Sequence, residues 1–342
     1  MKDKERPQDY GGQAVLEGVM MRSKEAMAIA VRRADGSLRI KHEPVTSIAK
    51  KHKWMGWPII RGAVSMVMMM SLGMKVLSAS ADMAGLEEEE PSKFEKWLAD
   101  KLGTGVDKIV MGLAVILAVA LSMGLFVLLP NLPVKALRAA GWSLLAVNLL
   151  SGVLRTIILM IYLYLCGLIP DMRRIFQYHG AEHKTIHCYE NGLPLTPENA
   201  QTFSTLHPRC GTSFLLITFI FSIIFYSIFD VLVMSITGYD LGSNYLMRVL
   251  TRLLLLPLVA GVSYELLKGL AHAETPLTRA LRWPGMQLQR LTTRPPTDKM
   301  LEVAIASLNA VLHGLPEGER TEDGLVILPG EPDPVQPEPK RA

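Results

Sequence analysis

The sequence is poor in charge, in cysteine and in the marks of a nucleic-acid-binding protein. Charged residues make up 20% of its 342 positions, against about 25% in an ordinary soluble domain, and they crowd the two ends of the chain. Three cysteines, an odd and sparse set, argue against a disulfide framework. The net charge is only +4, and the basic residues form no stripe interleaved with aromatics, so nucleic acid is not an expected partner. The first residues lack the apolar run of a signal peptide, so we expect no cleaved leader.

The sequence contains long hydrophobic runs instead. Hydrophobic residues make up 49% of the chain, and the mean hydropathy is +0.25. Four runs approach the roughly 20 residues that a spanning helix needs: 109–129, 146–169, 214–236 and 249–267. The sequence therefore predicts a mainly α membrane protein with about four transmembrane helices, in a membrane domain over 105–270, with the lipid bilayer as its surroundings.

Charged residues inside these runs are the next feature. Arg155 interrupts the second run, Asp230 lies near the end of the third, and Arg252 lies in the fourth. Charges at membrane depth are costly, so they pair with one another or line a cavity. We expect Asp230 and Arg252 to form an ion pair between consecutive helices, and the alternative is a polar pathway.

The segments before the first run are of two kinds. Residues 1–57 form a polar unit in which the glycine-rich stretch 11–18 is expected to be a loop. Alternating residues on both sides of Asp35-Gly36 predict a β-hairpin. The apolar segment 58–83 holds Arg61 and Lys75 with 13 uncharged residues between them, too few to cross a bilayer. We therefore expect an interfacial or re-entrant helix there.

Basic residues predict the orientation. The loop 170–213 is basic, both long termini are basic, and the turn 237–245 has neither lysine nor arginine. The positive-inside rule then places both termini and the 170–213 loop in the cytoplasm, as in a multi-pass protein of the bacterial inner membrane. The C-terminal segment 271–314 would be cytoplasmic, with an amphipathic helix near 299–312. The proline- and glutamate-rich residues 315–342 are expected to be a disordered tail.

The 170–213 loop gathers residues that bind metals. His179, His183, His187 and His207 lie there with Cys188 and Cys210. On a helix, the first three histidines repeat every four residues and face the same side. Two imidazoles one turn apart can hold one metal ion, and an intervening glutamate can activate water. We expect a divalent metal, zinc by preference, with His179 and His183 as ligands and Glu182 as the catalytic base.

The order His-x-x-Glu-His is also that of inverted zinc peptidases, in which a later acidic residue completes the ligand set. Glu265 is the leading third ligand, because the predicted topology puts it at the depth of His179. His187, His207 and Cys210 are rivals. The alternative is that the histidines only cap helix ends and hydrogen-bond one another.

Several blocks together resemble a known family. They are Gly11–Arg22, Arg61-Gly62, Phe176–Thr185, His207–Ser213 and Gly285–Arg294. In this combination the chain is similar to the bacterial YqhQ-like family, over about residues 10 to 312. The resemblance implies a bacterial multi-pass membrane protein of a family without an established activity, described as a predicted metal-dependent enzyme. It supplies no substrate.

Three functions remain open at this point. The first is a cytoplasm-facing, zinc-dependent hydrolase in the membrane. The second is a membrane scaffold or regulator without enzymatic activity, whose histidine cluster is structural. The third is an ion carrier or transporter that uses Arg155, Asp230 and Arg252; because four spans are few for a monomeric carrier, it would need to form oligomers. A homo-oligomer is compatible with all three.

Overall fold

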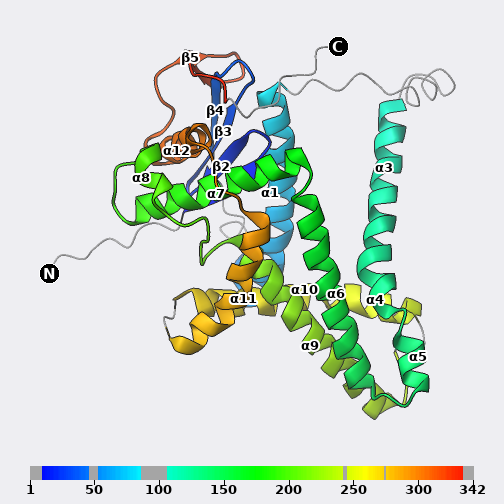
Figure 1. The fold of residues 1–342 in the computed structure, drawn as a ribbon. Coiled ribbons are helices and arrows are strands. Elements are labelled where there is room, and N and C mark those ends of the chain that lie inside the picture. Colours follow the sequence, from blue (N-terminus) through cyan, green and yellow to red (C-terminus); the bar gives the residue numbers. More distant parts are fainter. Residues whose placement is uncertain (1–9, 46–52, 86–105, 242–244, 273–274, 334–342) are drawn as a thin grey trace. The chain divides into compact units, whose positions relative to one another are not determined.

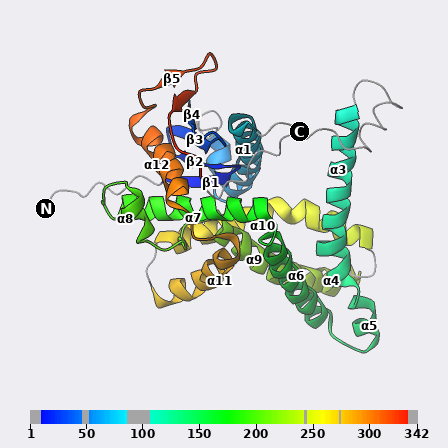
Figure 2. The same cartoon turned by 45° about the horizontal axis from the view of Figure 1, so that its top comes forward.

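The computed structural model describes residues 10–45, 53–85, 106–241, 245–272 and 275–333. In these residues the protein is mainly helical, with one small antiparallel sheet (Figures 1 and 2). The chain divides into two compact units. The first collects residues 1–86, 163–218 and 253–339, and the second collects 87–162 and 219–252.

The first unit is built on a six-stranded antiparallel sheet in the order β1-β2-β3-β4-β6-β5. Its strands are β1 (Gly11–Val15), β2 (Gly18–Arg22), β3 (Ala26–Arg32), β4 (Leu38–Pro44), β5 (Glu319–Arg320) and β6 (Val326–Leu328). The hairpin predicted around Asp35-Gly36 is confirmed, as β3 paired with β4. The loop expected over 11–18 is wrong: these residues form β1 and the start of β2, joined by a tight turn at Leu16-Glu17.

The C-terminal strands are a second departure from the sequence prediction. Residues 319–328 lie in the expected disordered tail, yet β6 pairs with β4, with Leu38 opposite Leu328. Asp333 is buried and contacts Arg174, which also holds both carboxylate oxygens of Glu17. The prediction fails here because a three-residue strand has almost no pattern of its own. Residues 334–342 lie outside the described part.

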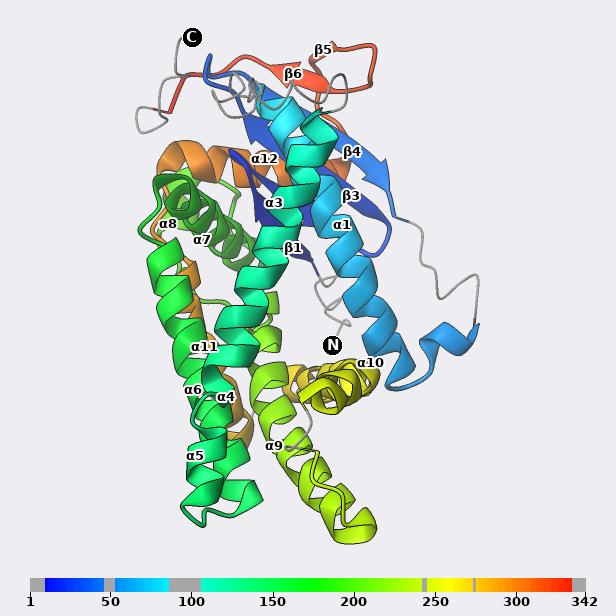
Figure 3. The same ribbon diagram turned by 90° about the vertical axis from the view of Figure 1, so that its right-hand side faces the viewer.

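Both faces of the sheet are covered, which explains why β2 and β3 are apolar apart from the arginine at the end of each. One face packs Val19, Met21, Ala28 and Ala30 against α7 (Pro170–Glu190) and α12 (Asp298–His313). The other face packs against α1 (Ile60–Ala84) (Figure 3). Helix α12 matches the amphipathic helix predicted near 299–312. Residues that alternate along a strand point to opposite faces, so each face here has its own apolar cluster.

Five helical segments are long and apolar enough to cross a membrane, as in a multi-pass membrane protein: α1, residues 112–139, α6 (Leu144–Cys166), α9 (Gly211–Thr237) and α10 (Tyr245–His272). The second of them comprises most of α3 (Val106–Met123), a π-helical turn η3 (Gly124–Leu128), α4 (Leu129–Asn131) and α5 (Val134–Ala139). The remaining helices are η2 (Lys53–Gly56), α8 (Pro197–Gln201) and α11 (Pro276–Thr292). Four of the five segments are the predicted spans.

The segment that is not one of the four predicted spans is α1, which covers the helix expected at the membrane interface. Its last turns are buried against the sheet at Val76, Ser80 and Met83, and the Ser80 hydroxyl accepts a hydrogen bond from the Leu16 amide. The helix as a whole is nevertheless long and apolar enough to cross a membrane, so the interfacial or re-entrant helix expected here stays a prediction.

Candidate metal centre

Helix α7 carries the three regularly spaced histidines. It begins with Pro170 at its first turn, where a missing amide hydrogen costs nothing, and it runs unbroken to Glu190. Because the whole loop segment 170–190 is helical, His179, His183 and His187 share one side, as predicted. The fourth histidine follows the short helix α8, in the segment that leads to Cys210 and α9.

Three side chains meet at one point on this side. His179 Nε2 lies 3.2 Å from Cys210 Sγ, and the rings of His179 and His183 are 4.4 Å apart between centroids. One nitrogen of each histidine and the Cys210 sulfur all lie within 4.8 Å of one another. A thiolate and two imidazoles from separate parts of the chain are thus brought into the range of a shared ion.

Backbone carbonyls hold both rings. His179 Nδ1 donates to the Thr292 carbonyl oxygen at 2.8 Å, and His183 Nδ1 donates to the Thr205 carbonyl oxygen at 2.5 Å. Each Nδ1 therefore carries the hydrogen, and each Nε2 keeps a lone pair. His183 Nε2 is buried and has no hydrogen-bond partner. Metal-binding histidines are commonly oriented in this way by a carbonyl at the second nitrogen.

The surroundings favour the protonation states that bind metals. Burial lowers the pKa of His183, which keeps its imidazole neutral. Burial raises the pKa of the Cys210 thiol, but the neighbouring His183 ring and the hydrogen bonds to Thr212 outweigh burial, so the pKa lies below its ordinary value. Neutral imidazole and thiolate are the forms that coordinate a cation.

The donor set fits zinc. Zinc takes nitrogen ligands at about 2.0–2.1 Å and sulfur ligands at about 2.3 Å, so a tetrahedral site separates N from S by about 3.5 Å. The 3.2 Å between His179 Nε2 and Cys210 Sγ needs only a small adjustment. Catalytic zinc sites use three protein ligands and leave the fourth position to water or substrate, and the three side chains that come together in the described residues match that number.

Glu182 lies beside this group, between α7 and β1. Its carboxyl is buried, and burial raises its pKa to about 8, while the neighbouring His179 and the amide of Gly12 act in the opposite direction. A side-chain carbon at position 12 would lie 2.9 Å from Glu182 Cδ. The lack of a side chain at Gly12 therefore leaves room for Glu182, which explains why a glycine lies inside a strand.

In a second group of possible ligands, the one carboxylate is already paired with an arginine. His187, Glu190 and His207 come close together, with His207 Nε2 at 3.5 Å from Glu190 Oε2. However, Glu190 also forms an ion pair with Arg209, and His187 Nε2 is hydrogen-bonded to the Leu206 carbonyl. A guanidinium next to the carboxylate opposes a second cation. The predicted ligands His187 and His207 thus neighbour the first group without joining it.

Glu265, the leading third ligand of the sequence prediction, is placed elsewhere. Its two oxygens accept hydrogen bonds from Nε and Nη2 of Arg61 at 2.6 and 2.5 Å. It is not among the residues that meet at His179, whereas its rival Cys210 is. The prediction used depth in the membrane alone, and equal depth does not show that two residues lie side by side.

Sequence reasoning missed the parts of the site that are backbone or contacts between distant segments. The carbonyls of Thr205 and Thr292 could not be found, because any residue type supplies a carbonyl. Gln289 was missed as well: its amide accepts from the His207 amide and donates to the His207 carbonyl, both at 2.8 Å. One signal for Gln289 was available, because it lies in Gly285–Arg294, one of the blocks that resemble the YqhQ-like family.

Comparisons with known proteins agree with the resemblance in the sequence. Residues 57–314 match the family described as "Protein of unknown function (DUF1385)". The "Uncharacterized protein YqhQ" of Bacillus subtilis (strain 168) is 36% identical over 314 residues, which is 90% of this chain and 93% of that protein. No solved structure matches the chain.

Proposed function

The chain belongs to the DUF1385 family, and we propose that it is a membrane-embedded, metal-dependent enzyme of the zinc hydrolase type. Neither the family's description nor the relative's name gives an activity, so the proposal rests on the geometry. The observation that carries it is the meeting of His179, His183 and Cys210, with both Nδ1 atoms held by carbonyls.

Each residue has a role in this proposal. His179 Nε2, His183 Nε2 and Cys210 Sγ hold the ion. A zinc ion in such a set acts as a Lewis acid and lowers the pKa of water. Glu182 accepts and returns a proton at its carboxylate, since a nearby cation favours the ionised form that burial opposes. Gly12 donates to this carboxylate and orients it.

The site belongs on the cytoplasmic side of the membrane in this proposal. The N-terminal strands, α7 from the loop after the second predicted span, and the C-terminal α12 and β6 share one core. That packing supports the prediction that these three segments lie on one side. Their basic residues favour the cytoplasm.

Metal analysis of the purified full-length protein tests the ligand set. We expect about one zinc per chain in the wild type and a loss of zinc in the His179→Ala, His183→Ala double variant. Cobalt loaded in place of zinc should give a thiolate-to-cobalt absorption band that Cys210→Ser removes. His313→Ala, at the end of α12 and away from the group, is the matched control. Equal and sub-stoichiometric zinc in all variants would refute the metal site.

Glu182→Gln separates an enzyme from a scaffold. The amide keeps the size of the side chain and cannot take a proton, so an enzyme should retain its fold and its metal and fail to complement a strain that lacks the protein. Full complementation by a zinc-loaded Glu182→Gln protein would mean that the metal is structural and that the protein acts as a scaffold.

A further inference from the structure

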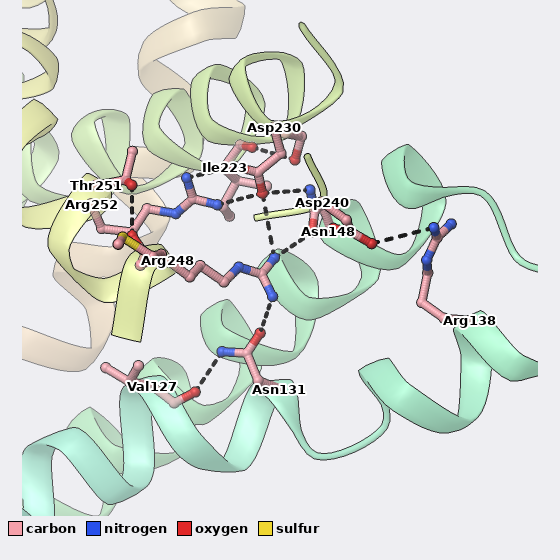
Figure 4. A network of polar contacts seen from close by, with 12 residues as sticks. Val127, Asn131, Arg138, Asn148, Ile223, Asp230, Asp240, Arg248, Thr251 and Arg252 are labelled. Carbon is pink, nitrogen blue, oxygen red and sulfur yellow. Dashed lines mark hydrogen bonds and ion pairs between the residues drawn. The ribbon is translucent and has the colours of Figure 1, made fainter. Parts of the chain in front are cut away.

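Asp230, the acidic residue of the third predicted span, is compensated within the protein. It is fully buried, and Arg252 donates to both of its oxygens at 2.9 and 2.6 Å, which confirms the expected ion pair (Figure 4). Asn148 donates to the same carboxylate at 2.9 Å and accepts a hydrogen bond from Arg248. A charge at this depth is costly without such partners. The arginines of α11, which follows the last predicted span, are in a different setting.

Helix α11 is amphipathic over its 17 residues. Its apolar side follows the spacing of helical turns through Leu277, Leu281, Pro284 and Leu288. The opposite side carries three arginines, Arg279, Arg282 and Arg290. Trp283 lies at the border of the two sides, one turn from Arg279. Leucines on one side, arginines on the other and a tryptophan between them are typical of a helix that lies in a membrane interface.

The two halves of α11 differ in burial. In the first half, Leu277 is 68% exposed, Leu281 50% and Trp283 62%. In the second half, Leu288 is buried, and the Thr292 carbonyl holds the ring of His179. The leucine side is therefore packed against the protein in its second half and exposed in its first. The exposed half needs a partner that accepts apolar side chains next to positive charge.

The place of α11 in the chain indicates a bilayer as that partner. Helix α10, which is long and apolar enough to cross a membrane, ends at His272, and α11 begins at Pro276. Four residues reach at most about 14 Å, so α11 must start close to the end of α10. Arg279 and Arg290 are exposed. Anionic headgroups attract such cations, and tryptophan is favoured at the level of the headgroups.

A second copy of the chain fits this surface less well. The three exposed apolar side chains of the first half offer on the order of 300 Å². A stable interface between proteins buries roughly 800 Å² on each partner. A bilayer has no such minimum, because its affinity for a helix grows with each apolar side chain that enters it.

We propose that the first half of α11 lies in the headgroup region of a bilayer that contains anionic phospholipid. Leu277 and Leu281 point toward the acyl chains, and Arg279 lies at the level of the phosphates. The second half of the same helix supplies the Thr292 carbonyl, so α11 joins the membrane surface to the ring of His179. The proposal does not depend on a metal, because none of the exposed residues of α11 is a proposed ligand.

Two spin-labelled cysteines on opposite sides of α11 test its position. Leu281→Cys and Arg279→Cys lie roughly 160° apart around the helix, at about 100° per residue. The full-length protein is placed in nanodiscs of phosphatidylcholine and phosphatidylglycerol, and labelled wild type corrects for the native cysteines. The label at Leu281→Cys should collide mainly with oxygen, which concentrates among acyl chains. The label at Arg279→Cys should collide mainly with a water-soluble nickel chelate.

Two results would overturn this position of the helix. Equal and high access of the nickel chelate to both labels would place the helix in water. A label at Leu281→Cys that neither reagent reaches, and that is broadened by a second label nearby, would show that another copy of the chain covers the leucine side.

Quenching of Trp283 by brominated lipids tests the role of the arginines. The difference in fluorescence between wild type and Trp283→Phe isolates this tryptophan. Brominated phosphatidylglycerol should quench it more than brominated phosphatidylcholine at the same mole fraction. Arg279→Gln should reduce this preference about fivefold, the effect of one cationic side chain near an anionic surface. Arg320→Gln, an exposed arginine on β5, is the matched control and should leave the preference unchanged.

Equal quenching by the two lipids in the wild type, or equal losses in Arg279→Gln and Arg320→Gln, would refute the preference for anionic lipid. Zinc content is measured on the same samples and should not change in Arg279→Gln. The membrane contact and the metal centre can therefore fail independently of each other.

Discussion

At the scale of single residues, the candidate centre depends on how close a strand and a helix can come. Gly12 of β1 lies directly beside Glu182 of α7, and a methyl group there would meet the Met20 carbonyl oxygen at 2.7 Å and Glu182 at 2.9 Å. Neither atom belongs to a flexible chain end, because one is backbone and the other is buried. The position of Glu182, the residue proposed to carry the proton, therefore depends on the lack of a side chain at Gly12.

This closeness makes Gly12→Ala a sensitive change. We expect it to reduce the free energy of unfolding by about 1–3 kcal/mol, the usual cost of overpacking, and to displace Glu182. Gly11→Ala is the matched control, because nothing lies within 4 Å of its added carbon, and it should change stability by less than about 0.5 kcal/mol. Thermal unfolding of both variants in the same detergent measures the difference. Equal stability of the two would show that β1 and α7 are less tightly packed than described.

The residues also show where sequence reasoning stops. The spacing of His179 and His183 was sufficient to place both on one side of a helix. Cys210 was one rival among three, and only the fold brings its sulfur to His179. Glu265 lies against Arg61 instead, which comes from a helix whose position no local pattern gives.

At the scale of elements, α12 is the helix that completes the sheet. The Ser307 hydroxyl accepts from the Met21 amide at 3.1 Å and donates to the Ala28 carbonyl at 3.0 Å, both buried. Met21 and Ala28 face each other on neighbouring strands. A single side chain of the helix therefore joins β2 to β3.

Replacing that side chain should have a measurable cost. Ser307→Ala leaves a buried amide without this acceptor, so we expect a loss of about 1–3 kcal/mol. Ser78→Ala, an exposed serine on α1, serves as the control and should be neutral. The midpoint of thermal unfolding, followed by circular dichroism, compares the two. A stable Ser307→Ala protein would imply that water or another group satisfies the amide.

Elements with strong local patterns were predictable, and those that depend on distant partners were not. The Asp-Gly turn and its alternating flanks identify β3 and β4 by themselves. β1 contains two glycines, which weaken a strand locally, and only pairing with β2 keeps it extended. β6 has three residues and depends on β4 for its conformation.

At the scale of the whole molecule, three distant parts of the chain share one core, and that core predicts a topology. Single cysteines at Lys24, Leu193 and Glu322, all exposed in the first unit, should react with a membrane-impermeant maleimide from the same side. With the positive-inside rule, that side is the cytoplasm, so labelling should occur in inside-out vesicles.

The control for this experiment is a cysteine at Tyr239, which is exposed in the turn between α9 and α10. It should react from the opposite side, because one predicted span separates it from the histidine-rich segment. Reaction of Lys24→Cys and Glu322→Cys from different sides would contradict the sheet, since β4 and β6 could not then pair.

The pairing of the chain's two ends has a consequence for biosynthesis. Met21 and Ser307 are 286 positions apart, and a ribosome that adds about 5–20 residues per second needs on the order of tens of seconds to connect them. In that interval α1, made directly after the strands, can cover one face of the nascent sheet at once. On the other face, the part that α12 covers must wait until the membrane spans have been made and α12 emerges, so that part is open to a chaperone during membrane insertion. A helix made after the membrane spans thus completes a sheet whose first four strands were made before them.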